Sequence, residues 1–168
     1  PTASLLSPGN NFTEHHLYRM PVLGGTPHLA MPGGIDYGSS YSTDGRQFAF
    51  LRAYSGLGKV EVLIAKADGS DERVLATRPY RDEDMGVAWS ANGKTVAFST
   101  SEATKKLRSS LWAISVADGS VREIYSTPDP IGRPRWLPDG SGLLVPIGNA
   151  GQVFAFRGQL WFISYPRG

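Results

Sequence analysis

An internal repeat limits what this chain can fold into more than any other feature of its sequence. Three segments, 41–50, 89–98 and 136–145, share an aromatic first residue and an Asp-Gly or Asn-Gly pair at the fourth and fifth positions. Asp44, Asn92 and Asp139 are 48 and 47 residues apart. A second motif ends in a glycine each time, at intervals of 44, 50 and 49 residues: Gly25, Gly69, Gly119 and Gly168. Two motifs with one period predict a repeat architecture.

Each repeat is predicted to form four short strands. An inner strand leads into the Asp-Gly or Asn-Gly pair, an apolar second strand follows, and a variable loop leads to a third strand. A second Asp-Gly pair then leads to the fourth strand. Because these dipeptides tolerate positive φ, we expect a two-residue hairpin turn at each pair. Four-stranded units that recur every 40–50 residues or so predict an all-β fold, the β-propeller.

One segment also fits a helix. Residues 102–114 contain neither Gly nor Pro, and Ala103, Leu107, Leu111 and Ile114 fall at helical spacing. The repeat register instead places a third strand at 110–116. We therefore expect a loop followed by a strand, with a short helical turn within 101–108 as the remaining alternative.

The chain is short for a closed ring. At one repeat per 48 residues, 168 residues make about 3.5 four-stranded antiparallel blades, whereas propellers close with about four to eight. We expect one partial propeller, with repeats at 1–36 (partial), 37–84, 85–132 and 133–168 (partial). Open sheet edges invite pairing with another chain. The expectation is therefore a fragment of a larger ring, or self-association through the open blade edges.

Composition excludes several classes of protein. Hydrophobic residues make up 40% of the chain, which includes 4 Trp, 7 Tyr and 7 Phe, so it can bury a core and is not disordered. A net charge of +2 with scattered basic residues argues against nucleic acid. The absence of cysteine excludes a disulfide framework and a thiol nucleophile. No apolar stretch approaches the roughly 20 residues of a spanning helix, and 1–10 lacks the order of a signal peptide. We expect membrane contact only through segments outside this chain.

The repeat motifs resemble those of a known family. Asp/Asn-Gly-(Arg/Lys)-x-x-Ala-Phe, followed by an apolar strand and Ala-Asp-Gly, resembles the TolB-like, WD-repeat-like propellers. The segments 18–27, 136–144 and 160–168 resemble more closely the propeller region of bacterial membrane-anchored serine/threonine protein kinases. In those kinases a cytoplasmic kinase domain and one membrane helix precede an extracytoplasmic propeller. The resemblance covers the chain from Leu17 onward; Ala91 and Asn92 depart from the family's usual Pro and Asp.

The resemblance implies a non-catalytic binding or sensing module, located in the periplasm or at the cell surface, that binds a protein or peptide partner. The chain carries no Gly-rich phosphate loop, His-Arg-Asp or Asp-Phe-Gly motif, so we expect no kinase activity in it. We also expect no cofactor. Two alternatives remain open: a free-standing TolB-like periplasmic scaffold, and the non-catalytic propeller of a prolyl-oligopeptidase-like serine peptidase.

Candidate binding residues lie in the loops. In a propeller, the loops between second and third strands share one face with the connections between blades, and we call this the loop face. These loops vary in length between the repeats, and rigid scaffolds commonly carry function on such loops. Mixed charge with aromatic residues suits a protein or peptide partner. The candidates are Tyr54, Tyr80, Arg81, Asp82, Glu83, Asp84, Lys105, Lys106, Arg108 and Arg133.

Neither group of metal-ligand residues predicts a metal site. The acidic run 82–84 lacks the spacing that wraps Ca²⁺, and arginines flank it. His15 and His16 are adjacent in a predicted strand and therefore point to opposite faces, whereas a zinc site needs three or four ligands. We expect no bound metal.

Four tryptophans fall in register, two on inner strands and two on third strands. They are Trp89, Trp136, Trp112 and Trp161. Aromatic side chains that recur at equivalent repeat positions are expected to pack between neighbouring blades, because each ring can bury about 150–250 Å².

Overall fold

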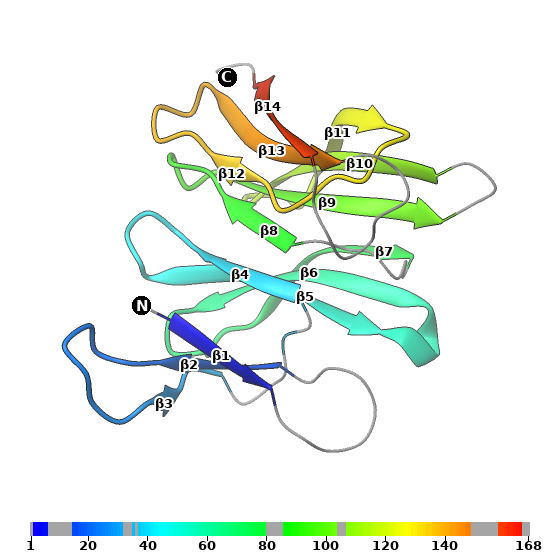
Figure 1. The fold of residues 1–168 in the computed structure, drawn as a ribbon. Coiled ribbons are helices and arrows are strands. Elements are labelled where there is room, and N and C mark those ends of the chain that lie inside the picture. The colour runs from blue at the N-terminus through cyan, green and yellow to red at the C-terminus, as the bar shows by residue number, and fades with distance from the viewer. Residues whose placement is uncertain are drawn as a thin grey trace.

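The computed structural model describes residues 2–6, 15–31, 35, 37–79, 86–103, 107–148 and 158–165. These residues form four antiparallel sheets that follow one another in space as they do in sequence (Figure 1). Within each sheet, strands that are neighbours in the chain are neighbours in the sheet. The prediction of an all-β fold built from four-stranded antiparallel sheets is confirmed.

The two central sheets have four strands each, and the two outer sheets have three. The first sheet contains β1 (Thr2–Leu6), β2 (His15–Arg19) and β3 (His28–Leu29). The second contains β4 (Tyr37–Tyr41), β5 (Gln47–Tyr54), β6 (Lys59–Lys66) and β7 (Arg73–Pro79). The third contains β8 (Gly86–Trp89), β9 (Thr95–Ala103), β10 (Leu107–Ser115) and β11 (Val121–Thr127). The fourth contains β12 (Arg135–Trp136), β13 (Gly142–Gly148) and β14 (Gly158–Ser164).

The segment with helical spacing forms strands. β9 and β10 pair continuously from Ala103 opposite Leu107 to Thr95 opposite Ser115. Leu111 packs against the fourth sheet and Ile114 against the second, so β10 is buried on both faces. A strand buried on both faces need not alternate polar and apolar residues, and its pattern can therefore imitate a helix. In the described part of the chain, helical structure is confined to a single 3₁₀ turn at Ser55–Leu57.

The Asp-Gly and Asn-Gly turns differ from the expected two-residue hairpins. Ser42 N–H donates to the Gln47 carbonyl at 2.9 Å, so four residues form the loop. Gly45 takes the positive φ, at 67°, whereas Asp44 accepts hydrogen bonds through Oδ1 from the Ser42 hydroxyl and the Arg46 N–H. The acid therefore caps the loop with its side chain instead of adopting a left-handed backbone.

The loop with asparagine shows that an amide can replace the carboxylate. Asn92 Oδ1 accepts from the Ser90 hydroxyl at 2.8 Å and from the Lys94 N–H at 3.0 Å. Gly93 again takes the positive φ, at 73°. The turn survives the replacement of Asp because its side chain needs only an oxygen that accepts hydrogen bonds.

The second type of turn also engages its acid through hydrogen bonds. Between β10 and β11, the Ser120 N–H donates to Asp118 Oδ1 at 3.0 Å. That bond, with the hydroxyls of Ser115 and Ser120, lowers the pKa of Asp118 to about 2. The folded pKa therefore lies below the value of about 3.9 expected in the unfolded chain. The resulting stabilisation is present above about pH 4 and is lost as the pH falls toward 2.

Asp118→Ala is therefore expected to lower the urea midpoint near neutral pH, with a difference from the unmodified protein that shrinks as the pH falls from about 5 to 2.5. Asp118→Asn keeps an acceptor oxygen and has no carboxyl to titrate. The difference in urea midpoint between Asp118→Asn and Asp118→Ala should therefore not change with pH. Equal pH dependence for the unmodified protein and both variants would contradict the assignment.

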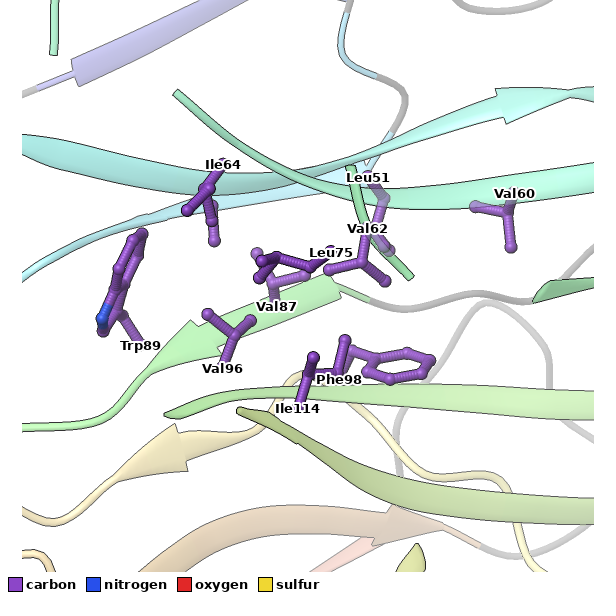
Figure 2. Close-up of a cluster of buried hydrophobic side chains, with 11 residues drawn as sticks. Leu51, Val60, Val62, Ile64, Leu75, Val87, Trp89, Val96, Phe98 and Ile114 are labelled. Atoms are coloured by element: carbon purple, nitrogen blue, oxygen red, sulfur yellow. The ribbon is translucent and has the colours of Figure 1, made fainter. Parts of the chain in front are cut away.

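Among the described residues, buried apolar side chains form three clusters, one at each junction between sheets. The central cluster joins the second and third sheets through side chains such as Val62, Leu75, Val87 and Phe98 (Figure 2). The other two join the first sheet to the second and the third to the fourth. Face-to-face packing of successive sheets thus provides the stability of the structure.

Three of the four tryptophans lie at these junctions, as expected. Trp89 is 6% exposed within the central cluster. Trp136 Nε1 donates to the Ala88 carbonyl of the third sheet at 3.1 Å. Trp112 stacks on Phe98 and lies beneath the guanidinium of Arg78, 4.0 Å from the ring centroid.

The expectation for Trp161 is wrong, because this side chain is 44% exposed. Strand register makes Trp161 the equivalent of Trp112, and Thr127 of the third sheet the equivalent of Arg78. Thr127 is too short to cover the indole as Arg78 covers Trp112. The partner residue on β13 is Val145, where β9 has Phe98. Trp161 therefore lacks both groups that enclose Trp112.

Candidate functional site

The two ends of the sheets carry different connections. The four-residue turns after β4, β8 and β12 lie together at one end, on the left in Figure 1, and we call this end the turn face. The β5–β6 connection, the end of β9 and the start of β10 lie at the opposite end, which is the loop face. Tyr54, Arg108 and Arg133 are the candidates that the structure describes. The other seven lie outside the described residues: Tyr80, Arg81, Asp82, Glu83, Asp84, Lys105 and Lys106.

Arg133 lies in a rigid connection between β11 and β12. The Gly132 N–H donates to the Pro146 carbonyl at 2.7 Å, and the Ser99 hydroxyl donates to the Gly132 carbonyl at 3.1 Å. Ile131 forms a β-bridge with Ile147. These bonds hold the backbone of the connection against β13 and β9, and so fix the position from which the Arg133 side chain extends.

The Arg133 side chain lies across the starts of β4 and β8. A Cβ atom added at Gly86 would be 3.2 Å from Arg133 Cγ, and one added at Gly38 would be 3.4 Å from Cζ. Gly38, Gly86 and Arg133 occupy the same position of the repeat, three residues before Tyr41, Trp89 and Trp136. The guanidinium therefore rests where two repeats have no side chain.

The charge of Arg133 has no counter-ion among the described residues. The residue is exposed, and no ion pair or hydrogen bond of its guanidinium occurs in the part of the chain that the structure covers. An exposed, positioned guanidinium is suited to bidentate binding of a carboxylate.

Tyr54 and Arg108 have local partners. Lys59 Nζ lies 4.7 Å from the Tyr54 ring centroid and 2.7 Å from Glu61 Oε1. The hydrogen bond that Lys59 donates to Glu61 raises the pKa of Lys59. Arg108 Nη2 donates to both carboxylate oxygens of Glu123, at 2.9 and 3.1 Å. Both side chains are thus engaged within their own sheets.

The structure does not bring the three described candidates into contact. Tyr54 belongs to the second sheet, Arg108 to the third, and Arg133 to the connection into the fourth. Gly38 and Gly86, which lie beneath Arg133, were not predicted as part of the site. Alignment of the residues before each inner strand would have revealed them, because Gly, Gly and Arg then fall in one column.

The described residues contain neither a metal site nor a membrane-spanning helix. In that part of the chain no group of three or more His, Cys, Asp or Glu side chains is placed to hold a metal ion. No helix there is long and apolar enough to cross a membrane.

The fold belongs to the β-propeller class. TolB from Acinetobacter baumannii superimposes with a TM-score of 0.69 at 13% identity, over 92% of this chain and 36% of that chain. A putative TolB from Agrobacterium tumefaciens gives 0.64 at 18% identity, over 89% of this chain and 56% of that chain. An acylaminoacyl peptidase in complex with Z-Gly-Gly-Phe-chloromethyl ketone gives a TM-score of 0.60 at 10% identity, over 90% of this chain and 28% of that chain.

These similarities establish the fold alone, because every identity is low. The chain spans 36% and 56% of the two TolB chains that it matches. Neither a protein-family model nor a curated protein sequence matches it. The structure is therefore similar to TolB-like propellers, in agreement with the propeller resemblance of the repeat motifs.

Proposed function

We propose that this chain is a non-catalytic binding module that captures a protein or peptide partner on its loop face, with Arg133 receiving an acidic group. The position of Arg133 carries the proposal. Its guanidinium lies over Gly38 and Gly86, and no acid of the described chain neutralises it. A charged group that is held in place before binding loses less conformational entropy on association than one on a freely rotating side chain.

The sequence resemblance supports a more specific assignment. In it, the chain is the extracytoplasmic part of a receptor-like serine/threonine kinase, and capture of the partner alters kinase association across the membrane. A free-standing TolB-like scaffold is the first alternative, and the likeness to TolB structures is compatible with it. The likeness to an acylaminoacyl peptidase is compatible with the second, a propeller attached to a hydrolase domain.

Sequencing the gene on both sides of this segment separates the three assignments. A kinase domain and a membrane helix upstream would support the receptor. An export signal without a catalytic domain would favour the scaffold and contradict the kinase link. An adjoining hydrolase domain would favour the peptidase.

The loop-face site is tested with a displayed library of random peptides selected on the immobilised protein. We expect the selected peptides to be rich in Asp and Glu, and Arg133→Gly to weaken their binding by roughly 10- to 100-fold, as for loss of a hydrogen-bonded charge. Glycine is the residue that two other repeats carry at this position, so folding should be preserved.

The matched control is Arg46→Gly on the turn face. The Arg46 side chain is 86% exposed, and its ion pair with Asp44 is long, with Nε 3.9 Å from Oδ2. Its replacement should leave peptide binding unchanged. Equal binding by the unmodified protein and Arg133→Gly, with both folded by circular dichroism, would overturn the assignment of Arg133.

A further inference from the structure

A pocket of about 550 Å³ opens on the turn face, at the junction of the third and fourth sheets. The third sheet contributes the turn into β9 and the adjoining ends of β9, β10 and β11, and the fourth contributes the residue after β14. It is at the opposite end of the sheets from Arg133. Its lining residues are Asn92, Lys94, Thr95, Ala113, Ser115, Ser120, Arg122 and Tyr165.

The pocket exists because the third sheet carries smaller side chains than the second at equivalent positions. Ala49 of β5 pairs with Ile64, and its equivalent Ala97 of β9 pairs with Ala113. Ile64 fills the central apolar cluster, whereas Ala113 leaves that volume open. Counting back from the motif glycines Gly69 and Gly119 aligns Ile64 with Ile114. In the structure Ile64 corresponds to Ala113 instead, because the turn after β10 is one residue longer than the turn after β6.

Two further differences enlarge the space and make it polar. Gln47 and Lys66 pair with each other in the second sheet, and their equivalents Thr95 and Ser115 pair in the third. Both replacements are shorter, and both line the pocket. The shorter side chains that open the pocket are therefore particular to this repeat.

The charge at the pocket is positive. Asn92 removes the negative charge that Asp44 and Asp139 carry in the other repeats. Lys94 and Arg122 form no ion pair in the described part of the chain. Asp118 in the neighbouring turn is the opposing charge, and its carboxylate is engaged by Ser120 N–H.

Arg122 differs from its equivalent at the preceding junction. Arg73 pairs with Ile64 and Arg122 with Ala113, so the two arginines correspond. Arg73 donates to the Val116 carbonyl of the next sheet at 2.8 Å. Arg122 instead lies 5.0 Å from the Tyr165 ring centroid, and no hydrogen bond of its guanidinium is found within the described residues. Arg122 therefore lines the pocket with a guanidinium that has no acceptor among the described residues.

We propose that this pocket binds a small organic oxyanion, with Arg122 and Lys94 holding a carboxylate or phosphate group and Tyr165 flanking the rest of the ligand. The volume lies within the range of about 300–1,000 Å³ typical of small-molecule sites. An arginine fork and a lysine ammonium are the side chains that bind such groups most strongly. The aromatic ring offers an apolar surface to the body of the molecule.

Isothermal titration calorimetry on the full-length protein tests the site. Citrate and inorganic phosphate are titrated separately at constant ionic strength, with chloride as the reference anion. We expect saturable binding of at least one probe. Binding of citrate alone identifies a carboxylate ligand, and binding of phosphate alone identifies a phosphate ester. Absence of binding for both probes would overturn the proposal.

Three variants locate the bound anion. Arg122→Gln and Lys94→Gln are each expected to weaken binding about tenfold. Ala113→Ile introduces the residue that the second sheet carries at the equivalent position, so it should fill the pocket and abolish binding without loss of fold. Arg46→Gln alters the equivalent of Lys94 in the preceding repeat and should have no effect. Undiminished binding by folded Ala113→Ile and Arg122→Gln would place the anion elsewhere and contradict the proposal.

Discussion

Trp89→Ala is expected to lower the free energy of unfolding by about 3–5 kcal/mol, the range for large aromatic side chains removed from protein cores. The indole is almost fully buried between the second and third sheets (Figure 2). Its Nε1–H donates to the Gly93 carbonyl at 3.1 Å, a bond that the truncation also removes. Because the side chain joins a sheet to its own turn and to the neighbouring sheet, both connections weaken together.

Urea unfolding followed by far-ultraviolet circular dichroism measures this effect. Trp161→Ala is the control, since Trp161 is exposed and its loss should change stability by no more than about 0.5 kcal/mol. A Trp89→Ala variant as stable as Trp161→Ala would show that the central junction does not depend on the indole.

Gly119→Ala is expected to destabilise the protein by about 2–5 kcal/mol, which combines left-handed backbone strain of about 1–2 kcal/mol with overpacking of about 1–3 kcal/mol. Gly119 has a φ of +71°, and an added Cβ would lie 2.8 Å from the Leu75 carbonyl oxygen. The obstacle is the backbone of β7 in the preceding sheet, which cannot move aside as a flexible side chain could. The substitution therefore separates the second and third sheets at the turn face.

The Gly93→Ala variant separates the effect of the Cβ contact with Leu75 from the effect of backbone strain. Gly93 has nearly the same φ, +73°, and nothing lies within 4 Å of an added Cβ. Its substitution should cost only the strain, about 1–2 kcal/mol. Equal losses for the two variants in the same urea assay would mean that the approach of Gly119 to Leu75 contributes nothing to stability.

The strands and their order could be predicted from the sequence because they depend on neighbouring residues. Each hairpin uses an acceptor side chain and a glycine within one short loop, as Asp44 with Gly45 and Asn92 with Gly93 show. The exact turn geometry was missed, because Asp-Gly fits both a two-residue and a four-residue loop. The packing of sheet on sheet decided between strand and helix for 107–115.

The candidate site was predictable only in part. Composition and loop position pointed to Tyr54, Arg108 and Arg133 alike, yet Arg108 is paired with Glu123 and Tyr54 lies beside Lys59. Whether a basic side chain forms an ion pair depends on its neighbours in the folded structure. The residue type alone therefore could not distinguish Arg133 from Arg108.

The sequence by itself determined that this protein is a series of four-stranded antiparallel sheets, because the period and the turn residues recur in the chain and act over a few residues. Only the tertiary structure decided which charged side chains and which spaces between the sheets remain available for binding. Arg133 lies over Gly38 and Gly86, which are 95 and 47 residues away in sequence. The turn-face pocket arises from Ala113 standing where Ile64 stands one repeat earlier. Both depend on one sheet packing against the next, and sheet-to-sheet packing joins residues that no local pattern links.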